Sequence, residues 1–433
     1  MRRFLSIAFL CWLIQACSPT TPVDTNQAIT TIDATISKLD SMALFSGVVL
    51  VARYDSVLYQ RAAGYSDQGQ TIKNTTDTRF GIGSVTKLFT GVLFTRLEEE
   101  GLFTESDPVE SFVSGIPEGN NGHKITFSHL LNHRSGISHR VSTPDKNCGG
   151  LTIDDTIEKV RASELEFNPG ESRLYSSAGY TTLAYAMAEA KQQSFGELTE
   201  SMIFQPAGML NSSEEGGSWI LAQPAMPLHL GITNGVLSVV DAPCEQLGFL
   251  TGGGSAVSTS GDLLNFILSV QRGTFGESVT RIWWPADEQH WTGWAGRTYG
   301  YEAYVDVHPR DGLTVIILSN LRSAVNWQIR EYIKRAIRGG TLPEIQLPPP
   351  PVPTFENVAD LPGNYDRNGR IAEISLKDGT LFRGENQFYP ISGDRYYIPA
   401  SGTQMRFRRN ANAEVDAMIQ IRGDNEMVYI KTE

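Results

Sequence analysis

Four consecutive prolines, at positions 348–351, constrain the fold of this chain more than any other feature. Proline lacks an amide hydrogen and has a fixed backbone torsion, so such a run does not fit inside a helix or a central strand and forms a stiff, extended linker. Helical and strand patterns alternate before the run. Only short strand patterns follow it, at 371–376, 380–382, 396–398, 404–408, 417–421 and 427–430. The 433 residues therefore predict a large mixed domain over 41–340, a linker over 341–355 and a small all-β domain over 356–433.

The large domain begins and ends with strand patterns and carries helical patterns between them. β-Branched runs predict strands at 47–53, 57–64, 301–307 and 313–318. Apolar residues at spacings of three and four predict helices at 85–100, 153–161, 178–191, 195–202, 260–271 and 324–337. This order predicts an α/β (α+β) domain, in which one sheet is flanked by helices and an all-helical subdomain is inserted.

The first residues are typical of an export signal. Arg2 and Arg3 precede an apolar run over 4–14, which is too short to cross a bilayer as a helix but suits the core of a signal peptide. The following Ile-Gln-Ala-Cys sequence resembles a bacterial lipobox, in which Cys17 becomes the lipid-modified N-terminus. An ordinary signal peptide, cleaved before Cys17, is the alternative.

The expected product is an exported bacterial lipoprotein, anchored to a membrane and facing the periplasm or the cell surface. Residues 1–16 would be its signal peptide and residues 17–40 a polar, proline-bearing tether. Cys148 and Cys244 are then the remaining cysteines of an oxidising compartment, and they either form a disulfide or stay as two thiols. No cysteine or histidine spacing predicts a metal site or another cofactor. The net charge of −12 argues against a nucleic-acid partner.

The chemistry centres on Ser84 and Lys87, which lie three residues apart where the first long helical pattern begins. At that spacing both side chains occupy one face of a helix, so the lysine amine can reach the serine hydroxyl. A lysine shielded from water has a lowered pKa and can help to remove the proton of a nucleophilic serine. Chance alone produces such a pair about once in a chain of this composition, so the spacing by itself is weak evidence.

The surrounding segments make the pattern specific. Residues 80–90 (Phe-Gly-Ile-Gly-Ser-Val-Thr-Lys-Leu-Phe-Thr) resemble the nucleophile segment of the serine β-lactamase and penicillin-binding superfamily. They are similar to its class C-like branch, which includes D-alanyl-D-alanine carboxypeptidases and family VIII carboxylesterases. Further matches follow in order at 125–137, 167–177, 203–209 and 252–263. The resemblance implies an antiparallel sheet with an all-helical subdomain, and residues 361–365 similarly resemble the start of a lipocalin-like β-module.

The resemblance also implies roles for individual residues. Tyr175 would approach Ser84 and Lys87 and would act as general base and then as general acid. The backbone N–H groups of Ser84 and Arg297 would form the oxyanion hole. His129 and His133 would be structural.

Two positions depart from the family pattern. Ser177 replaces an asparagine that hydrogen-bonds a substrate amide, and serine is too short to span the same distance. The third motif, which commonly carries a cation that faces a substrate carboxylate, corresponds here to Trp294-Ala295-Gly296. A register three residues earlier also lacks a cation. We therefore expect Ser177 and these three residues to form a site in which the third motif supplies no cation for a substrate carboxylate. If such a substrate were bound, Arg297 would be the nearest candidate cation.

These features predict a serine hydrolase that forms an acyl-enzyme on Ser84. A carboxylesterase acting on small uncharged esters is favoured, because a carboxylate buried without a cation is costly. The alternatives are a peptidoglycan D-alanyl-D-alanine carboxypeptidase or class C-like β-lactamase, and a non-catalytic binding protein on the same fold. The expected partners are a small ester or peptidoglycan-like substrate and the membrane lipid. The sequence does not determine the oligomeric state.

Overall fold

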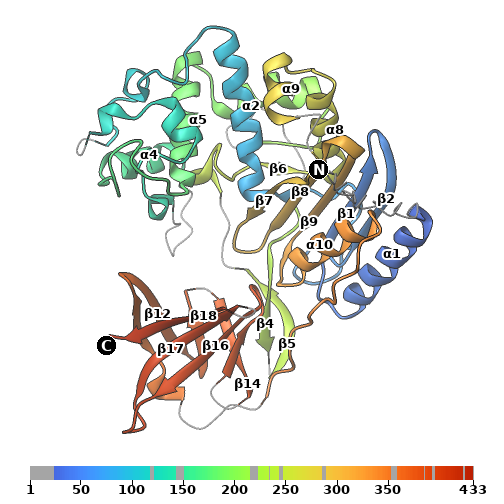
Figure 1. Ribbon diagram of the computed structural model, residues 1–433, viewed down its shortest axis with the longest axis vertical. Coiled ribbons are helices and arrows are strands. Elements are labelled where there is room, and N and C mark those ends of the chain that lie inside the picture. Colours follow the sequence, from blue (N-terminus) through green and yellow to red (C-terminus); the bar gives the residue numbers. More distant parts are fainter. Residues whose placement is uncertain are drawn as a thin grey trace, which may run out of the picture.

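A computed structural model gives the protein as two folded parts, with a mixed domain above a β-barrel in the view of Figure 1. The structure describes residues 24–117, 121–142, 151–214, 223–233, 235–242, 247–284, 289–352, 358–384, 386–392, 395–422 and 425–432. Cys17, Cys148 and Cys244 lie outside these residues, so the lipidation and the disulfide stay predictions. Within the described ranges, no helix has the length and apolar character needed to cross a membrane.

The mixed domain is built on an antiparallel sheet, as predicted, and this sheet has five strands. Its strand order is β2-β1-β9-β8-β7, with bounds β1 Gly47–Arg53, β2 Ser56–Ala63, β7 Thr292–Arg297, β8 Glu302–His308 and β9 Leu313–Ser319. β1 and β9 pair along their whole lengths and are buried on both faces except at Arg53, which explains their continuous apolar runs. β2 lies at one edge and β7 at the other.

Helices cover both faces of this sheet. Side chains alternate along β1, so Val48 and Leu50 join one core cluster while Val49 and Val51 join the other. The first cluster packs against α2 (Thr86–Glu99) and α8 (Ser260–Gln271), and the second against α1 (Thr25–Ser41) and α10 (Asn326–Ala336).

Helix α1 corrects the predicted tether over 17–40. Its N-cap is Asp24, whose carboxylate accepts hydrogen bonds from the backbone N–H groups of the next turn. Ile32 and Ile36 lie four residues apart and are fully buried in the second core cluster. The polar residues that suggested a tether are therefore not representative of the segment from residue 25 onward.

The inserted helices form the predicted helical subdomain, seen at the upper left of Figure 1. Its helices are α3 Phe127–Leu131, α4 Ile153–Arg161, α5 Ser177–Lys191, α6 Phe195–Thr199 and α7 Gln205–Ala207, with a π-helical turn over Glu200–Phe204 between the last two. α9 Glu277–Trp283 follows α8 on the sheet side, and β3 Phe80–Gly81 pairs with β6 Val257–Ser258. Phe89 of α2 makes edge contacts with the rings of Phe204 and Phe266, which helps to join the subdomain to the sheet.

A second small sheet, which the sequence analysis missed, lies between the mixed domain and the barrel. Its order is β10-β4-β5, with bounds β4 Leu228–Thr233, β5 Val236–Asp241 and β10 Leu321–Arg322. The side-chain amide of Gln387, from the barrel, accepts a hydrogen bond from the backbone N–H of Ile232 at 3.0 Å. The backbone N–H of Ala324 donates to the carbonyl of Pro399 at 3.0 Å. These contacts fix the barrel against β4 and against the segment that leads into α10.

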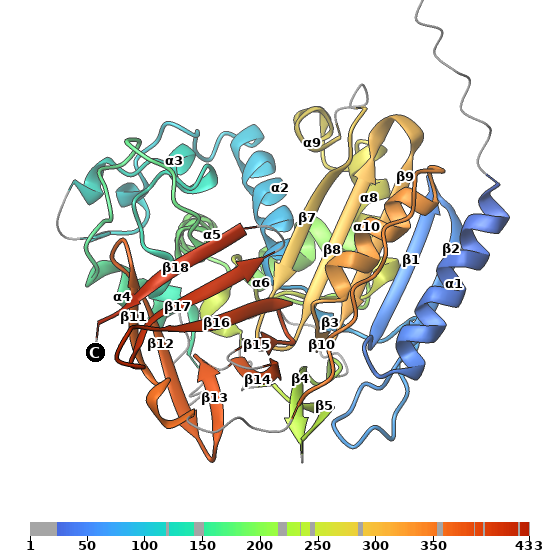
Figure 2. The ribbon, with the colours of Figure 1, turned by 60° about the horizontal axis from the view of Figure 1, so that its bottom comes forward.

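The C-terminal part is a closed eight-stranded barrel, which confirms the predicted small all-β domain (Figure 2). Its strands are β11 Gly363–Arg367, β12 Arg370–Lys377, β13 Thr380–Arg383, β14 Asn386–Ser392, β15 Arg395–Ile398, β16 Thr403–Arg409, β17 Val415–Arg422 and β18 Asn425–Lys431. Large side chains fill the interior, among them Tyr365, Phe388 and Phe407. The linker before it follows the barrel wall, where the Tyr389 hydroxyl donates to the carbonyl of Pro349 at 2.8 Å.

Candidate active site

Ser84 lies in a 3-10 turn, Gly83–Val85, that leads directly into α2. Gly83 has a φ of +49°, a conformation that favours glycine. The start of a helix leaves backbone N–H groups without intrahelical partners, and these can face a developing negative charge. The local sequence thus places the Ser84 hydroxyl at the N-terminus of α2, and Lys87 lies one turn further along the helix.

Three side chains expected to act together meet here. The Ser84 Oγ lies 2.6 Å from the Tyr175 Oη, and the Lys87 Nζ donates to the Ser84 Oγ at 3.2 Å. Lys87 also donates to the Ser177 Oγ at 3.2 Å and to the carbonyl of Gly253. Tyr175 and Ser177 flank the start of α5, so this hydrogen-bond network joins the sheet side of the site to the helical subdomain.

The pKa values of Lys87 and Tyr175 are both lowered, but for different reasons. Burial of the Lys87 amine disfavours its charged form and lowers its pKa. Burial alone would raise the pKa of Tyr175, but the nearby Lys87 ammonium and the hydrogen bonds to its oxygen outweigh burial and lower it. A lowered pKa makes the phenolate of Tyr175 more accessible, and a phenolate oxygen 2.6 Å from the Ser84 hydroxyl is suited to receive the proton of the serine.

The C-terminal end of β7 packs against the Ser84 turn, and the backbones of the two segments are in contact. A Cβ added to Gly83 would lie 2.8 Å from the backbone N of Arg297, and one added to Gly296 would lie 2.9 Å from the backbone N of Ser84. The two segments approach this closely because both positions are glycine. The N–H groups of Ser84 and Arg297 therefore lie on neighbouring segments, which is the arrangement that an oxyanion hole requires.

His133 and His139 pack against Tyr175, with ring centroids 4.5 and 5.5 Å from the tyrosine ring. The Nδ1 of His133 accepts a hydrogen bond from the backbone N–H of Ser176 at 3.3 Å. Burial and the charges of Lys87 and Arg173 lower the pKa of His133 to about 4. A histidine that is neutral and accepts from the backbone positions the Tyr175 segment, which agrees with the structural role expected for it.

Protonation of His133 gives a pH dependence of stability that can be measured. The unfolded chain binds a proton at this histidine below pH 6.5, whereas the folded protein resists protonation down to about pH 4. Stability should therefore fall as pH decreases through this window, with His133 contributing up to about 1.4 kcal/mol per pH unit. Urea unfolding of a His133→Asn variant, in which asparagine tolerates the left-handed backbone, should show a shallower pH dependence between 6.5 and 4. An unchanged slope would contradict the assignment.

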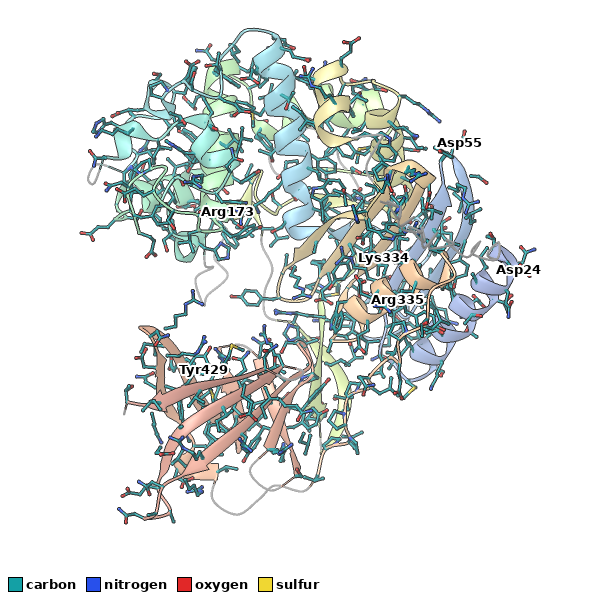
Figure 3. The ribbon with its side chains drawn as sticks, in the orientation of Figure 1. Asp24, Asp55, Arg173, Lys334, Arg335 and Tyr429 are labelled. Carbon is teal, nitrogen blue, oxygen red and sulfur yellow. The ribbon has the colours of Figure 1, made fainter. Side chains whose placement is uncertain are left out.

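A cavity of about 710 Å³ opens over the Ser84 hydroxyl. Leu247, Phe249 and Leu250 contribute apolar side chains to its lining, and Tyr299, Tyr304 and Trp327 contribute further aromatic surface. Figure 3 shows the side chains of this region, with Arg173 on the side of the helical subdomain that faces the barrel. Among the described side chains, no group of three or more His, Cys, Asp or Glu residues is placed to hold a metal ion.

The structure corrects the expected role of Trp294. Ala295 and Arg297 of β7 line the cavity, together with Ser177 of α5. Trp294 lies between the two β7 residues in the sequence, so its side chain points to the opposite face of the strand, where it packs against the first core cluster. The indole therefore supports the sheet and does not form the wall of the cavity.

The structure also corrects the expectation that the site lacks a cation. Arg297, Arg322 and Arg330 line the cavity. Arg297 forms an ion pair with Glu302, with 2.9 Å between Nε and Oε1, and Arg330 makes two 2.6 Å hydrogen bonds to the Asp306 carboxylate. The sequence analysis considered only the triplet on β7 and so missed Arg322 on β10 and Arg330 on α10.

Comparison with known proteins agrees with this geometry. The β-lactamase family model matches residues 32–337. Penicillin-binding protein 4* of Bacillus subtilis is 31% identical over 170 residues, which are 38% of this chain and 37% of that protein. Protein flp of Staphylococcus aureus is 23% identical over 313 residues, which are 67% of this chain and 62% of that protein. The matches thus span only part of these relatives.

A solved structure extends the similarity to the barrel. The octameric penicillin-binding protein homologue from Pyrococcus abyssi superposes with a TM-score of 0.61 and 20% identity, covering 92% of this chain and 99% of that chain. At this identity the likeness concerns the fold. The family match covers most of the chain, and the chain therefore belongs to the β-lactamase family of serine hydrolases.

Proposed function

We propose that the protein is a carboxylesterase that cleaves small esters through an acyl-enzyme on Ser84. The observation that carries this proposal is the contact network in which Tyr175 Oη and Lys87 Nζ both reach the Ser84 Oγ. In a pair without a catalytic role, the lysine would be solvated at the surface. Here the Lys87 amine is buried and a phenol lies at hydrogen-bond distance from the serine, as expected for a catalytic site.

Acylation begins when the Tyr175 phenolate, stabilised by the Lys87 ammonium, removes the proton of the Ser84 hydroxyl. The Ser84 oxygen attacks the ester carbonyl, and the N–H groups of Ser84 and Arg297 stabilise the resulting oxyanion. The tetrahedral intermediate collapses as the bond to the leaving oxygen breaks, and Tyr175 returns its proton to the departing alcohol. Ser84 then carries the acyl group.

Deacylation repeats these steps with water. Tyr175 takes a proton from a water molecule, which attacks the acyl carbonyl, and the oxyanion again forms beside the same two N–H groups. When the intermediate collapses, the Ser84 oxygen recovers the proton from Tyr175. The free acid leaves and the resting site is restored.

Two features favour an uncharged ester as the substrate. An alkoxide leaves more readily than an amine, and Ser177 is too short to orient an amide as the longer asparagine would. Arg297 is ion-paired with Glu302, and Arg330 with Asp306. A carboxylate entering the cavity would compete with these pairs.

The ester preference can be tested with substrates that share one acyl group. We expect p-nitrophenyl butyrate to be hydrolysed with a kcat/KM at least about 100-fold above that of butyryl p-nitroanilide, because the protein must orient and protonate the poorer leaving group. Nitrocefin should be slower than the ester by a similar factor. A Ser84→Ala variant is the control for background hydrolysis, and an anilide cleaved as fast as the ester would contradict the proposal.

A second function is favoured by one observation. The Arg297 side chain is 52% exposed and lines the cavity, so its guanidinium can reach a substrate carboxylate in spite of its pairing with Glu302. This geometry suits a D-alanyl-D-alanine carboxypeptidase or a β-lactamase, whose substrates carry a carboxylate. Turnover of nitrocefin or a D-Ala-D-Ala peptide faster than every simple ester tested would put this function first.

A further inference from the structure

Glu302 is a buried carboxylate that the proposed reaction does not use. It begins β8, its side chain is 2% exposed, and it lies directly opposite Arg297 in the β7–β8 pairing. Burial raises the pKa of Glu302, although the opposing charge of Arg297 and a hydrogen bond from Asn326 counteract this effect. Removing a carboxylate from water costs free energy, so we expect Glu302 to have a specific effect on the residues that contact it.

The partners of Glu302 come from two different elements, β7 and α10. Its Oε1 lies 2.9 Å from the Nε of Arg297 on β7, and its Oε2 accepts from the Nδ2 of Asn326 at the start of α10 at 2.6 Å. Arg297 also donates from Nη2 to the Tyr304 Oη at 3.0 Å. The guanidinium is thus held at two of its nitrogens by two residues of the neighbouring strand β8.

Holding this side chain also constrains the backbone of residue 297. Arg297 is the last residue of β7, and the chain turns immediately after it, with Thr298 N donating to the carbonyl of Tyr301 at 3.0 Å. Strand ends fray more easily than strand centres. The backbone N–H expected in the oxyanion hole therefore belongs to Arg297, which lies at a strand end. The contacts of its side chain hold this residue in place.

We propose that Glu302 is a positioning residue, which acts through the Arg297 side chain to keep the Arg297 N–H directed into the oxyanion hole. This inference rests on the proposed hydrolysis at Ser84. The Arg297–Glu302 ion pair should then stabilise the transition state, in which the oxyanion forms. It should have little effect on the binding of the ground-state ester.

The test compares Glu302→Gln with a matched variant, Asp262→Asn, using p-nitrophenyl butyrate. Asp262 is also a buried carboxylate, 4% exposed, with its pKa raised by burial, but its hydrogen-bond partners Asn211 and Ser212 belong neither to β7 and β8 nor to the Ser84 turn. We expect Glu302→Gln to lower kcat by about 10- to 100-fold, less than the loss of a whole oxyanion donor, with KM changed less than threefold. Asp262→Asn should lower the thermal midpoint while leaving kcat within about threefold of wild type.

A second variant covers the case in which Glu302→Gln fails to fold. Arg297→Leu keeps the backbone N–H but removes the side chain through which Glu302 acts, so kcat should fall by a similar factor and the double variant should lose little more. Unchanged kcat in folded Glu302→Gln or Arg297→Leu, or a loss confined to KM, would overturn the inference. Absence of ester hydrolysis by the wild type would instead refute the proposed function.

Discussion

Replacing Tyr175 with phenylalanine is expected to lower kcat/KM for p-nitrophenyl butyrate by about 1000-fold, a typical effect of losing a general acid–base. The substitution removes only the hydroxyl that lies 2.6 Å from the Ser84 Oγ. The ring contacts with His133 and His139 are kept, so the thermal midpoint should stay near that of the wild type. Steady-state kinetics and a thermal melt on the same preparation check both expectations.

Lys87 should belong to the same functional unit. Lys87→Met removes the amine that contacts Ser84 and keeps an unbranched side chain in the buried space, so activity should fall by a similar factor. Because the amine and the phenol share one proton transfer, the double variant with Tyr175→Phe should lose little more than either single variant. Substantial activity is expected for His133→Asn. A folded but inactive His133→Asn protein, with Tyr175→Phe still active, would show that the histidine is the base.

The second large loss of activity is expected from a substitution at Gly296. A Cβ added to Gly296 would overlap the carbonyl oxygen of Ile82 and lie 2.9 Å from the backbone N of Ser84. Because both are backbone atoms, β7 and the Ser84 turn must separate. Gly296→Ala should therefore lower kcat by about 100-fold or more, the size of effect seen when an oxyanion donor is lost.

The matched control is Gly261→Ala on α8, where the nearest atom to an added Cβ is 3.9 Å away. This variant should keep full activity and gain slightly in stability, because alanine is the better helix former. Gly296→Ala turnover within threefold of wild type would mean that the close approach of β7 to Ser84 does not form the oxyanion hole.

The parts of the site that could be predicted are those with local signals. Ser84 and Lys87 lie one helical turn apart, which is a local signal, and the segments that contain them and Tyr175 resemble motifs of the family. The spacing therefore predicted the serine and the lysine, and the resemblance of its segment to the family predicted the tyrosine. No comparable local pattern in the sequence indicates which residues line the cavity.

The errors have physical causes that can be named. Trp294 was placed in the cavity because the sequence motif does not give the side of the strand on which each residue lies, and strand alternation turns the indole toward the core. Arg322 and Arg330 reach the cavity from β10 and α10, which only the tertiary fold brings beside β7. A cation-free site could thus not be inferred from one triplet.

The fold shows the same division between local and tertiary signals. The alternating apolar residues of the C-terminal part predicted six of the barrel strands, but β11 and β14 were missed, and β14 contains Pro390, a residue unfavourable in strands. The strands β4 and β5 gain their order from pairing with each other and with β10, and from the barrel contact at Gln387. Propensity does not encode that contact.

The central claim is that Ser84 is an activated nucleophile, and covalent labelling tests it most directly. The full-length protein would be treated with a fluorophosphonate probe, digested and mapped by mass spectrometry, with Ser84→Ala as control. We predict one adduct, on the peptide that contains Ser84, that forms much more slowly in Lys87→Met and Tyr175→Phe. No adduct on the folded wild-type protein, or an adduct on another residue that persists in Ser84→Ala, would contradict the claim and favour a non-catalytic binding protein or a different site.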